Sequence, residues 1–292
     1  MEGALEIVAR AAVLVFVIAC MAAAGLGLGV RDVVAPLRRG RLVGLALAAN
    51  FVVAPAVAWG LAAAFGLEQP YATGLILLGS AAGAPFLPKL AALARGDAAF
   101  AVGLMLLLTV GTAAFLPVAL PVLTPGLSAD PWPILRPILV TMLLPLGAAM
   151  FVRGCSGRWA NRLRPAVGLV SNVGMVVAVV LLIGLNVRAM LDTFGSGAVA
   201  AAVVFVLAML AVGYVLGGPA PTTRSVVGLG SGQRNIAAAL TVVAGNADDP
   251  RVVIMLLVST IVGLLVLVPA ARYLGRPASR VAAVAVPQEA AR

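Results

Sequence analysis

Residues 225–246 read SVVGLGSGQRNIAAALTVVAGN, and this stretch decides how the whole chain is interpreted. It is long and apolar enough to cross a bilayer, which takes about 20 residues of helix. Its middle nevertheless holds Arg234, and a cation at membrane depth costs at least about 2.5–3.5 kcal/mol on insertion scales. Three glycines, Gln233 and Asn235 continue a helix poorly, directly before the strong helix former IAAAL. The pattern predicts a helix interrupted at mid-membrane, and transporters place substrate and ion sites at such breaks.

The composition makes the bilayer the solvent of this chain. Hydrophobic residues make up 63% of the 292 residues and charged residues only 10%, which is more apolar surface than a soluble domain of this length needs. The formal net charge of +10 is typical of nucleic-acid binding, but the arginines fall in short connections between apolar spans. We therefore expect a lipid bilayer and no nucleic acid as the partner of this surface.

The titratable residues exclude several kinds of chemistry. The chain has no histidine, and every aspartate and glutamate lies at a terminus or in a predicted connection. A membrane interior without carboxylate or imidazole argues against a proton relay, a metal site and an intramembrane enzyme. We expect no catalytic residue, no metal and no cofactor.

The apolar segments predict an all-α polytopic membrane protein with nine spans, at 8–29, 42–65, 71–95, 98–123, 134–152, 166–190, 196–217, 225–245 and 251–273. Most of the 20 arginines and lysines fall in the odd-numbered connections and the C-terminal tail. By the positive-inside rule, this places the N-terminus outside the cell membrane and the C-terminus in the cytoplasm. We expect one transmembrane domain over 1–275 and a disordered tail over 276–292.

A second span is also predicted to be interrupted. Residues 71–95 hold Gly83, Pro85 and Pro88 near their middle, and each proline removes a backbone donor and clashes one turn back. The two interrupted spans run in opposite directions, which indicates an inverted repeat over about 8–123 and 134–273 with two crossed discontinuous helices. The alternative is two ordinary kinked helices. The residues predicted at the breaks are Gly83, Pro85, Pro88, Gly230 and Gly232.

These breaks carry a resemblance to a known family. Residues 79–118, GSAAGAPFLPKLAALARGDAAFAVGLMLLLTVGTAAFLPV, resemble the first crossover motif of the bile acid:sodium symporter family. Residues 232–235, GQRN, resemble its second signature, and residues 21–32, MAAAGLGLGVRD, resemble its opening turn. The resemblance covers about 20–275.

The resemblance implies an inverted-repeat transporter of nine helices. A panel subdomain of spans one, five and six would move against a core subdomain of the other spans. The implied function is secondary active transport of a small organic anion by alternating access.

The sodium-site motifs of the family are degenerate here. The family's Ser-Asn pair falls at Leu87 and Pro88, its glutamate at Gly230, and its glutamine at Arg234. Because sodium prefers oxygen ligands with a carboxylate among them, and a guanidinium repels it, we expect little sodium dependence. The alternative is a sodium-coupled symporter of organic anions that uses neutral ligands, namely Ser80, Thr109, Thr112, Gln233 and Asn235.

The buried cation Arg234 has three interpretations. It donates hydrogen bonds to the carbonyl ends of the broken helices, it binds the anionic substrate by a bidentate contact, or it extends to the membrane surface. Lys89 either extends to the cytoplasmic surface or lines the same cavity. Asn50, Ser171 and Asn172 either hydrogen-bond between helices or, for the last two, face the cavity. The predicted substrate-binding set is Arg234, Asn235, Gln233, Ser171, Asn172 and Lys89.

Substrate identity stays open at this level. Bile-acid-like sterols, pantothenate, keto acids and sulfonates all suit an anion site, and the sequence does not determine the oligomeric state.

Overall fold

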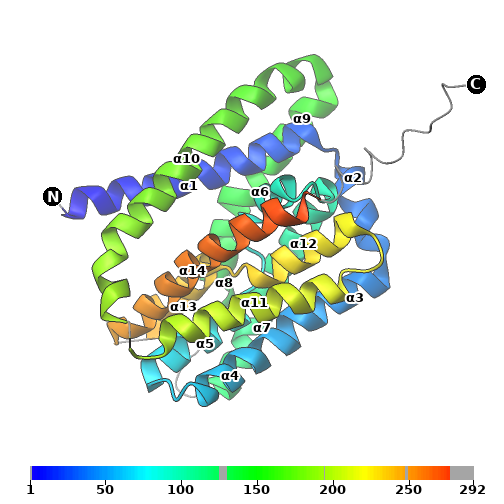
Figure 1. Cartoon of the computed structure of the whole chain (residues 1–292). Helices are drawn as coiled ribbons and strands as arrows, with labels where there is room; N and C mark the ends of the chain where they lie inside the picture. Colours follow the sequence, from blue (N-terminus) through cyan, green and yellow to red (C-terminus); the bar gives the residue numbers. More distant parts are fainter. Residues whose placement is uncertain (1, 125–129, 194, 247–248, 277–292) are drawn as a thin grey trace, which may run out of the picture.

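A computed structural model describes residues 2–124, 130–193, 195–246 and 249–276, and these residues form helices without any strand (Figure 1). Among them, six helical segments are long and apolar enough to cross a membrane. The prediction of an all-α polytopic membrane protein is confirmed. The tail 277–292 lies outside the described residues, and the count of nine crossings, the inverted repeat and the orientation of the termini stay predictions.

The helices follow one another along the chain in two series. The first series consists of α1 (Glu2–Gly27), α2 (Val30–Val34), η1 (Ala35–Arg38), α3 (Gly40–Ala48), η2 (Ala49–Val53), α4 (Ala54–Ala64), α5 (Gln69–Ser80), α6 (Leu87–Leu93) and α7 (Ala98–Leu123). The second consists of α8 (Pro131–Pro137), η3 (Ile138–Leu143), α9 (Leu144–Cys155), α10 (Gly157–Asp192), α11 (Ala198–Leu216), α12 (Pro221–Gly232), α13 (Ile236–Asn246) and α14 (Pro250–Leu274).

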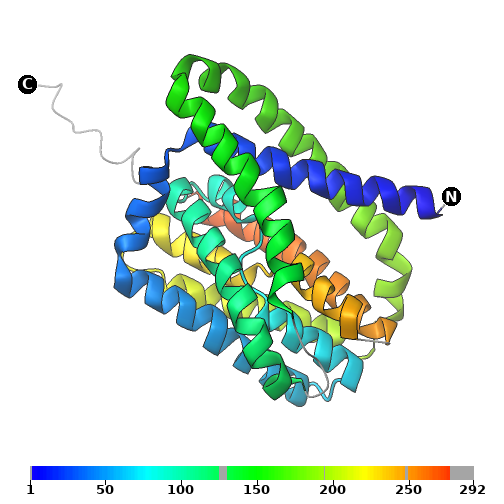
Figure 2. The same cartoon turned by 180° about the vertical axis from the view of Figure 1, so that it is seen from behind.

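The helices divide into two groups in space. Helices α1, α9 and α10 pack against one another, whereas α4, α5, α11, α12 and α14 pack together as a second group (Figures 1 and 2). The first group comes from the predicted spans one, five and six, and we call it the panel. The second group, with α6, α7 and α13, we call the core subdomain. The grouping agrees with the predicted division into panel and core.

The helix α10 is longer than its predicted span of 166–190. It begins at Gly157, directly after Ser156, so the arginine-rich connection that the sequence predicted is helical. Arginine is a good helix former, and its long side chain reaches water from a helix near the membrane surface. The Arg162 guanidinium also lies 5.9 Å from the centre of the Trp159 ring, one turn away on the same helix.

Both predicted interruptions are present. Helix α5 ends at Ser80 and α6 begins at Leu87, while α12 ends at Gly232 and α13 begins at Ile236. Of the residues predicted at the breaks, Gly232 is the last residue of α12, and two others lie further inside helices. Pro88 occupies the first turn of α6, where no backbone N–H is needed, and Gly230 lies within α12. A side chain at Gly230 would press on Leu87, with its Cβ 3.0 Å from a Leu87 methyl group.

Gly83 explains why the first break is irregular rather than kinked. Its φ of +81° lies in the left-handed region, which residues with a side chain rarely adopt. A Cβ at this position would overlap the backbone nitrogen of Thr109 on α7. The chain therefore passes close against α7 at this point, and only glycine allows the approach.

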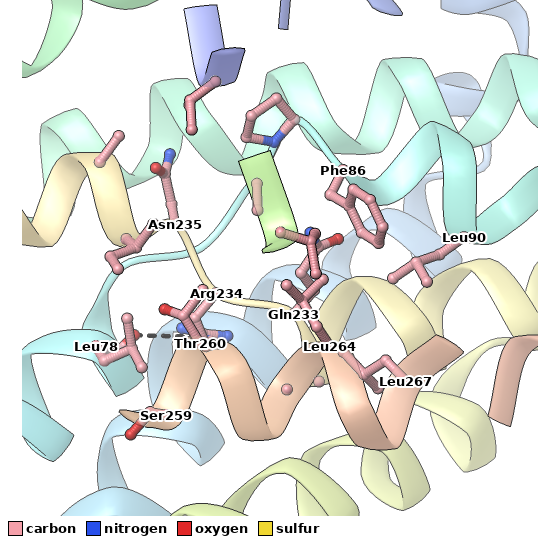
Figure 3. Close-up of a pocket in the computed structure, with 18 of the residues that line it drawn as sticks. Leu78, Phe86, Leu90, Gln233, Arg234, Asn235, Ser259, Thr260, Leu264 and Leu267 are labelled. Atoms are coloured by element: carbon pink, nitrogen blue, oxygen red, sulfur yellow. Dashed lines mark hydrogen bonds between the residues drawn. The ribbon is translucent and has the colours of Figure 1, made fainter. Parts of the chain in front are cut away.

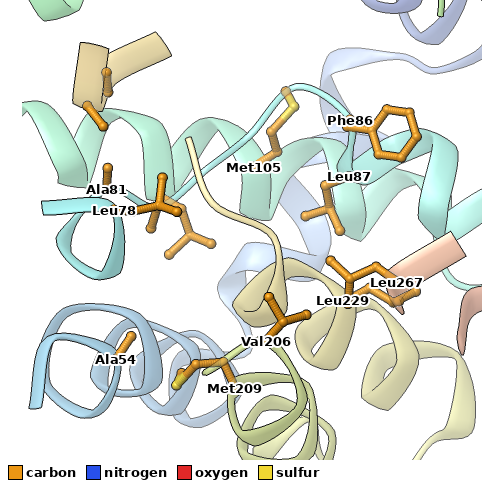
Figure 4. Packing of buried hydrophobic residues seen from close by; sticks show 14 of the residues in the cluster. Ala54, Leu78, Ala81, Phe86, Leu87, Met105, Val206, Met209, Leu229 and Leu267 are labelled. Carbon is orange, nitrogen blue, oxygen red and sulfur yellow. The ribbon is translucent and has the colours of Figure 1, made fainter. Parts of the chain in front are cut away.

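Apolar side chains surround the two breaks. Leu87, Met105, Val206, Met209 and Leu229 come from the four helices α6, α7, α11 and α12, are almost fully buried, and pack in one cluster (Figure 4). In a bilayer this contact stabilises mainly through close packing, because lipid tails are as apolar as these side chains. The breaks are thus held inside protein, which is where irregular backbone is tolerated at membrane depth.

Candidate functional site

The two breaks contact each other directly. The Asn235 N–H donates to the carbonyl of Ala81 over 2.9 Å, and the Asn235 side-chain amide donates to the carbonyl of Gly83 over 3.2 Å. The same side chain accepts a bond of 3.2 Å from the Ala238 N–H and so caps the first turn of α13. The prediction that the broken helices meet near residues 83–88 and 230–235 is confirmed.

Arg234 joins the breaks a second time. Its Nε donates to the carbonyl of Leu78 over 3.1 Å (Figure 3). One terminal nitrogen donates to Asn50 Oδ1 over 2.8 Å and to the carbonyl of Ser231 over 3.3 Å. The other donates to the carbonyl of Gly79 and, over 3.5 Å, to the carbonyl of Asn50. A guanidinium has five N–H donors, and all five are directed at protein oxygens.

This geometry distinguishes between the interpretations of Arg234. The side chain is 7% exposed and points at the last-turn carbonyls of α5, so it does not extend to the membrane surface. Carbonyls in the last turn of a helix lack their usual partner four residues on, because the helix ends there. The Leu78 carbonyl also accepts from the Ala81 N–H over 3.0 Å. The contacts support the interpretation in which Arg234 stabilises the broken helices. A direct bidentate contact with a substrate would require some of these bonds to break.

Asn50 completes this arrangement, although from the sequence it was expected only to hydrogen-bond between helices. It is fully buried on the π-helical turn η2, where its amide donates to the carbonyl of Ala46 over 2.9 Å and to Ser231 Oγ over 3.0 Å. A π-helical turn often marks a functional position. The available signal was an amide side chain in a span that is otherwise apolar.

The hydroxyls proposed as ion ligands hold the first break in place. Thr109 Oγ1 lies 2.6 Å from the carbonyl of Gly83, and Thr112 Oγ1 accepts from the Ala82 N–H over 2.8 Å. Ser80 donates to the carbonyl of Ile76 over 2.8 Å. These three hydroxyls are fully buried and do not line the cavity described next. The described residues contain no cluster of histidine, cysteine, aspartate and glutamate that could hold a metal ion.

A cavity of about 190 Å³ lies between the panel and the core subdomain, beside both breaks (Figure 3). The panel contributes Phe16 of α1 and Met175 of α10, and the core subdomain contributes Phe86, Phe205 and residues 232–237. Most of the lining is apolar. Of the predicted substrate-binding residues, Gln233, Arg234 and Asn235 line this cavity.

The cavity wall contains polar side chains that lack a hydrogen-bond partner in the described part of the chain, and Gln233 is one of them. Its Oε1 is buried without a hydrogen-bond partner among the described residues, as is Ser259 Oγ on α14. An unpaired buried oxygen carries a desolvation cost of about 1–3 kcal/mol. By contrast, Thr260 in the same wall donates to the carbonyl of Leu256 over 2.7 Å.

The other three predicted substrate-binding residues lie elsewhere. Lys89, Ser171 and Asn172 do not line the cavity. Lys89 and Asn172 meet where α6 of the core subdomain faces α10 of the panel, and Ser171 precedes Asn172 on α10. Lys89 Nζ donates to Asn172 Oδ1 over 2.7 Å, so the ammonium group contacts the panel rather than only the membrane surface. The sequence could not place them because their meeting depends on how the two groups of helices dock.

An ion cluster lies at the first turn of α14. Arg251 contacts Glu68 over 2.6 Å and Asp249 over 2.8 Å, which ties the α4–α5 connection to the start of α14. The hydrogen bonds that the Arg251 side chain and backbone N–H donate lower the pKa of Asp249. The cluster is exposed, so we assign it a small part in stability.

Comparison with known proteins gives one finding. The model of the Sodium Bile acid symporter family matches residues 13–193, which is more than half of the chain and runs from α1 to the end of α10. The match includes the first break and ends before the second. No curated protein matches the chain.

Proposed function

Because this chain belongs to the sodium bile acid symporter family, a family of membrane transporters rather than enzymes, we propose that it is a secondary active transporter of a small organic anion. In this proposal the panel and the core subdomain move against each other and expose the cavity to each side of the membrane in turn. Family membership and the six membrane-spanning candidates establish a multi-pass membrane protein. The anionic substrate and the mode of coupling are the proposed part.

One observation carries the proposal. The wall of the cavity holds the buried cation Arg234, whose contacts are all with neutral oxygens, and the membrane interior of this sequence has no carboxylate to balance it. A unit negative charge about 4 Å away gains about 4 kcal/mol at an effective dielectric constant of about 20. An anion in the cavity is therefore favoured electrostatically even though no guanidinium N–H is free to bind it directly.

The helix α13 adds to this attraction. Its first two residues, Ile236 and Ala237, line the cavity, and the helix is 11 residues long. The N-terminal end of a helix carries a partial positive charge and unpaired N–H groups, which favour a nearby anion. Gln233 adds a side-chain amide between the helix end and the apolar part of the wall, and the NH2 group of an amide can donate to an anion.

The size of the cavity favours a small substrate. Cavities that hold drug-sized molecules measure about 300–1,000 Å³, and this one measures about 190 Å³. Its lining includes Phe16, Phe86 and Phe205, so the body of the anion is expected to be apolar. A small carboxylate or sulfonate with an apolar body fits these features better than a sterol.

The environment of Arg234 also favours transport without sodium. Five protein oxygens, from Leu78, Gly79, Asn50 and Ser231, converge on the guanidinium. Such oxygens are the ligands that a hard cation uses, and here a tethered cation already holds them. The second candidate is a sodium symporter that uses Ser80, Thr109 and Thr112, whose hydroxyls are hydrogen-bonded to the backbone.

A ligand-stabilisation experiment tests the proposed function. The thermal unfolding of purified protein is measured with a series of small carboxylates, each compared with its neutral amide, such as benzoate with benzamide. We expect saturable stabilisation by members of the carboxylate series, no effect of the amides, and equal affinities in sodium and potassium salts. Stabilisation by amides as strong as by acids would contradict the anion assignment, and affinity that rises only with sodium would favour the symporter.

A further inference from the structure

A second group of polar residues lies at the boundary between the panel and the core subdomain, where α6 faces α10. Lys89 on α6 donates to Asn172 on α10 over 2.7 Å, and Ser171 precedes Asn172 on the same helix. The thiol of Cys20 on α1 lies 3.9 Å from the carbonyl of Pro85, directly before α6. The lining of the central cavity includes Pro85, Phe86 and Leu90, so this cluster is its neighbour.

The ammonium group of Lys89 has more hydrogen-bond donors than protein partners among the described residues. It carries three N–H donors, and its one hydrogen bond among the described residues goes to a neutral amide oxygen. By comparison, Arg251 is paired with the carboxylates of Glu68 and Asp249. Lys89 is half-buried, and Asn172, which accepts its hydrogen bond, is exposed. Arg234 differs, because its donors are all matched.

Ser171 is a second polar side chain here that lacks a hydrogen-bond partner in the described part of the chain. Its side chain is fully buried, and its Oγ has no hydrogen-bond partner among the described residues. The Cys20 thiol is its neighbour, but sulfur is a weak partner for a hydroxyl. A ligand oxygen that accepted from both Ser171 and Lys89 would satisfy a buried orphan hydroxyl and an incompletely paired cation together. A carboxylate provides two such oxygens.

We propose that Lys89 and Ser171 form a second anion-binding position. While this position is empty, Lys89 donates its hydrogen bond to Asn172 instead. The proposal rests on the function proposed above and extends it, because the carboxylate or sulfonate group of the substrate would pass from the central cavity to this site. Binding replaces the Lys89–Asn172 hydrogen bond, which joins α6 of the core subdomain to α10 of the panel. Occupation of the site therefore releases one contact between the two groups of helices.

The two partners of this hydrogen bond are expected to have opposite effects on anion affinity. Lys89→Gln removes the charge that binds the anion, whereas Asn172→Ala removes the group that competes with it. The probe is potassium benzoate, titrated against potassium chloride at constant ionic strength, with thermal unfolding of the full-length purified protein as the readout. Arg95→Gln is the matched control, because it removes an exposed cation from the connection that follows α6.

We expect Lys89→Gln to weaken benzoate binding at least about tenfold. Asn172→Ala should strengthen it at least about threefold, and Arg95→Gln should leave it unchanged. A purely structural hydrogen bond would instead make both variants less stable without opposite changes in affinity. Parent, Lys89→Gln and Asn172→Ala proteins that bind benzoate equally would overturn this site and leave the central cavity as the place of binding. Failure of benzoate to stabilise Asn172→Ala, in which Lys89 is free, would overturn it even if the parent binds other anions.

Discussion

At the scale of single residues, Arg234 shows how one cation can be kept inside a membrane protein without a carboxylate. Its five N–H donors meet carbonyl and amide oxygens from α5, η2 and α12, so every donor is matched. The side chain is therefore a structural link between helix ends as well as a fixed charge. Because it links segments more than 150 residues apart in sequence, its removal should affect the fold before it affects any ligand.

We expect Arg234→Gln to lower the free energy of unfolding by about 2–4 kcal/mol without ligand, because it leaves several buried carbonyls unpaired. Thermal unfolding in detergent, with Arg41→Gln as an exposed control, measures this. Arg234→Lys should fall between the two, since lysine keeps the charge but loses the planar arrangement of donors. An Arg234→Gln protein as stable as Arg41→Gln would show that the guanidinium contacts do not stabilise the breaks.

A second prediction follows from the same oxygens. Arg234→Ala removes the tethered cation and leaves the carbonyls of Leu78 and Gly79 beside Asn50, which is a set of ligands suited to a small hard cation. We expect sodium chloride to raise the melting temperature of this variant more than potassium chloride does. The parent protein should respond equally to both salts. Equal increases in the melting temperature of the variant in both salts would show that these oxygens do not form a site selective for sodium.

At the scale of helical elements, the first break depends on backbone that only glycine adopts and on partners from α7. Gly83 has a φ of +81° and lies against Thr109, whose hydroxyl donates a hydrogen bond to the Gly83 carbonyl. We expect Gly83→Ala to destabilise the protein by about 3 kcal/mol or more, since the new Cβ is strained and meets backbone atoms. The control is Gly147→Ala on α9, where a Cβ meets nothing within 4 Å. That change should be neutral or stabilising by about 0.5–1 kcal/mol. Similar melting temperatures for the two variants would contradict this account.

At the scale of the whole molecule, the boundary between panel and core subdomain is where alternating access would operate. The Lys89–Asn172 hydrogen bond crosses this boundary. The buried thiol of Cys20, on α1 of the panel, lies 3.9 Å from the carbonyl of Pro85 in the core subdomain. Asn172→Asp places a carboxylate opposite Lys89 and converts the contact into an ion pair, which should hold the two groups of helices together more firmly.

We expect Asn172→Asp to slow alkylation of Cys20 by at least about threefold, and Asn172→Ala to accelerate it. The measurement uses a Cys155→Ser background, because Cys155 is exposed and would otherwise react first. Val173→Ala serves as the control on the next residue of α10, which is exposed. If Asn172→Asp and Asn172→Ala alkylate at the same rate, the hydrogen bond does not govern movement at this boundary.

Much of this architecture could be predicted from the sequence. Apolar runs of membrane length predict helices because the bilayer offers no other partner for backbone N–H and C=O groups. The glycines and prolines near residues 79–88 and 228–235 predict interruptions for the same local reason. The buried Arg234 could be identified as exceptional because the cost of a cation in the membrane does not depend on its neighbours.

These local patterns could not predict which groups hydrogen-bond to one another across the fold. Proline alone does not mark a break, since Pro117 and Pro121 lie inside the continuous helix α7. The breaks form where Thr109 and Asn235 donate to freed carbonyls and Thr112 accepts from a freed N–H. Likewise, Asn50 binds Arg234 across the fold, and Lys89 meets Asn172 instead of lining the cavity. Helix and interruption were thus determined by local sequence, because they depend on backbone hydrogen bonding within a few residues. The pairing of each polar group was decided only by tertiary packing, which brings together atoms that are distant along the chain.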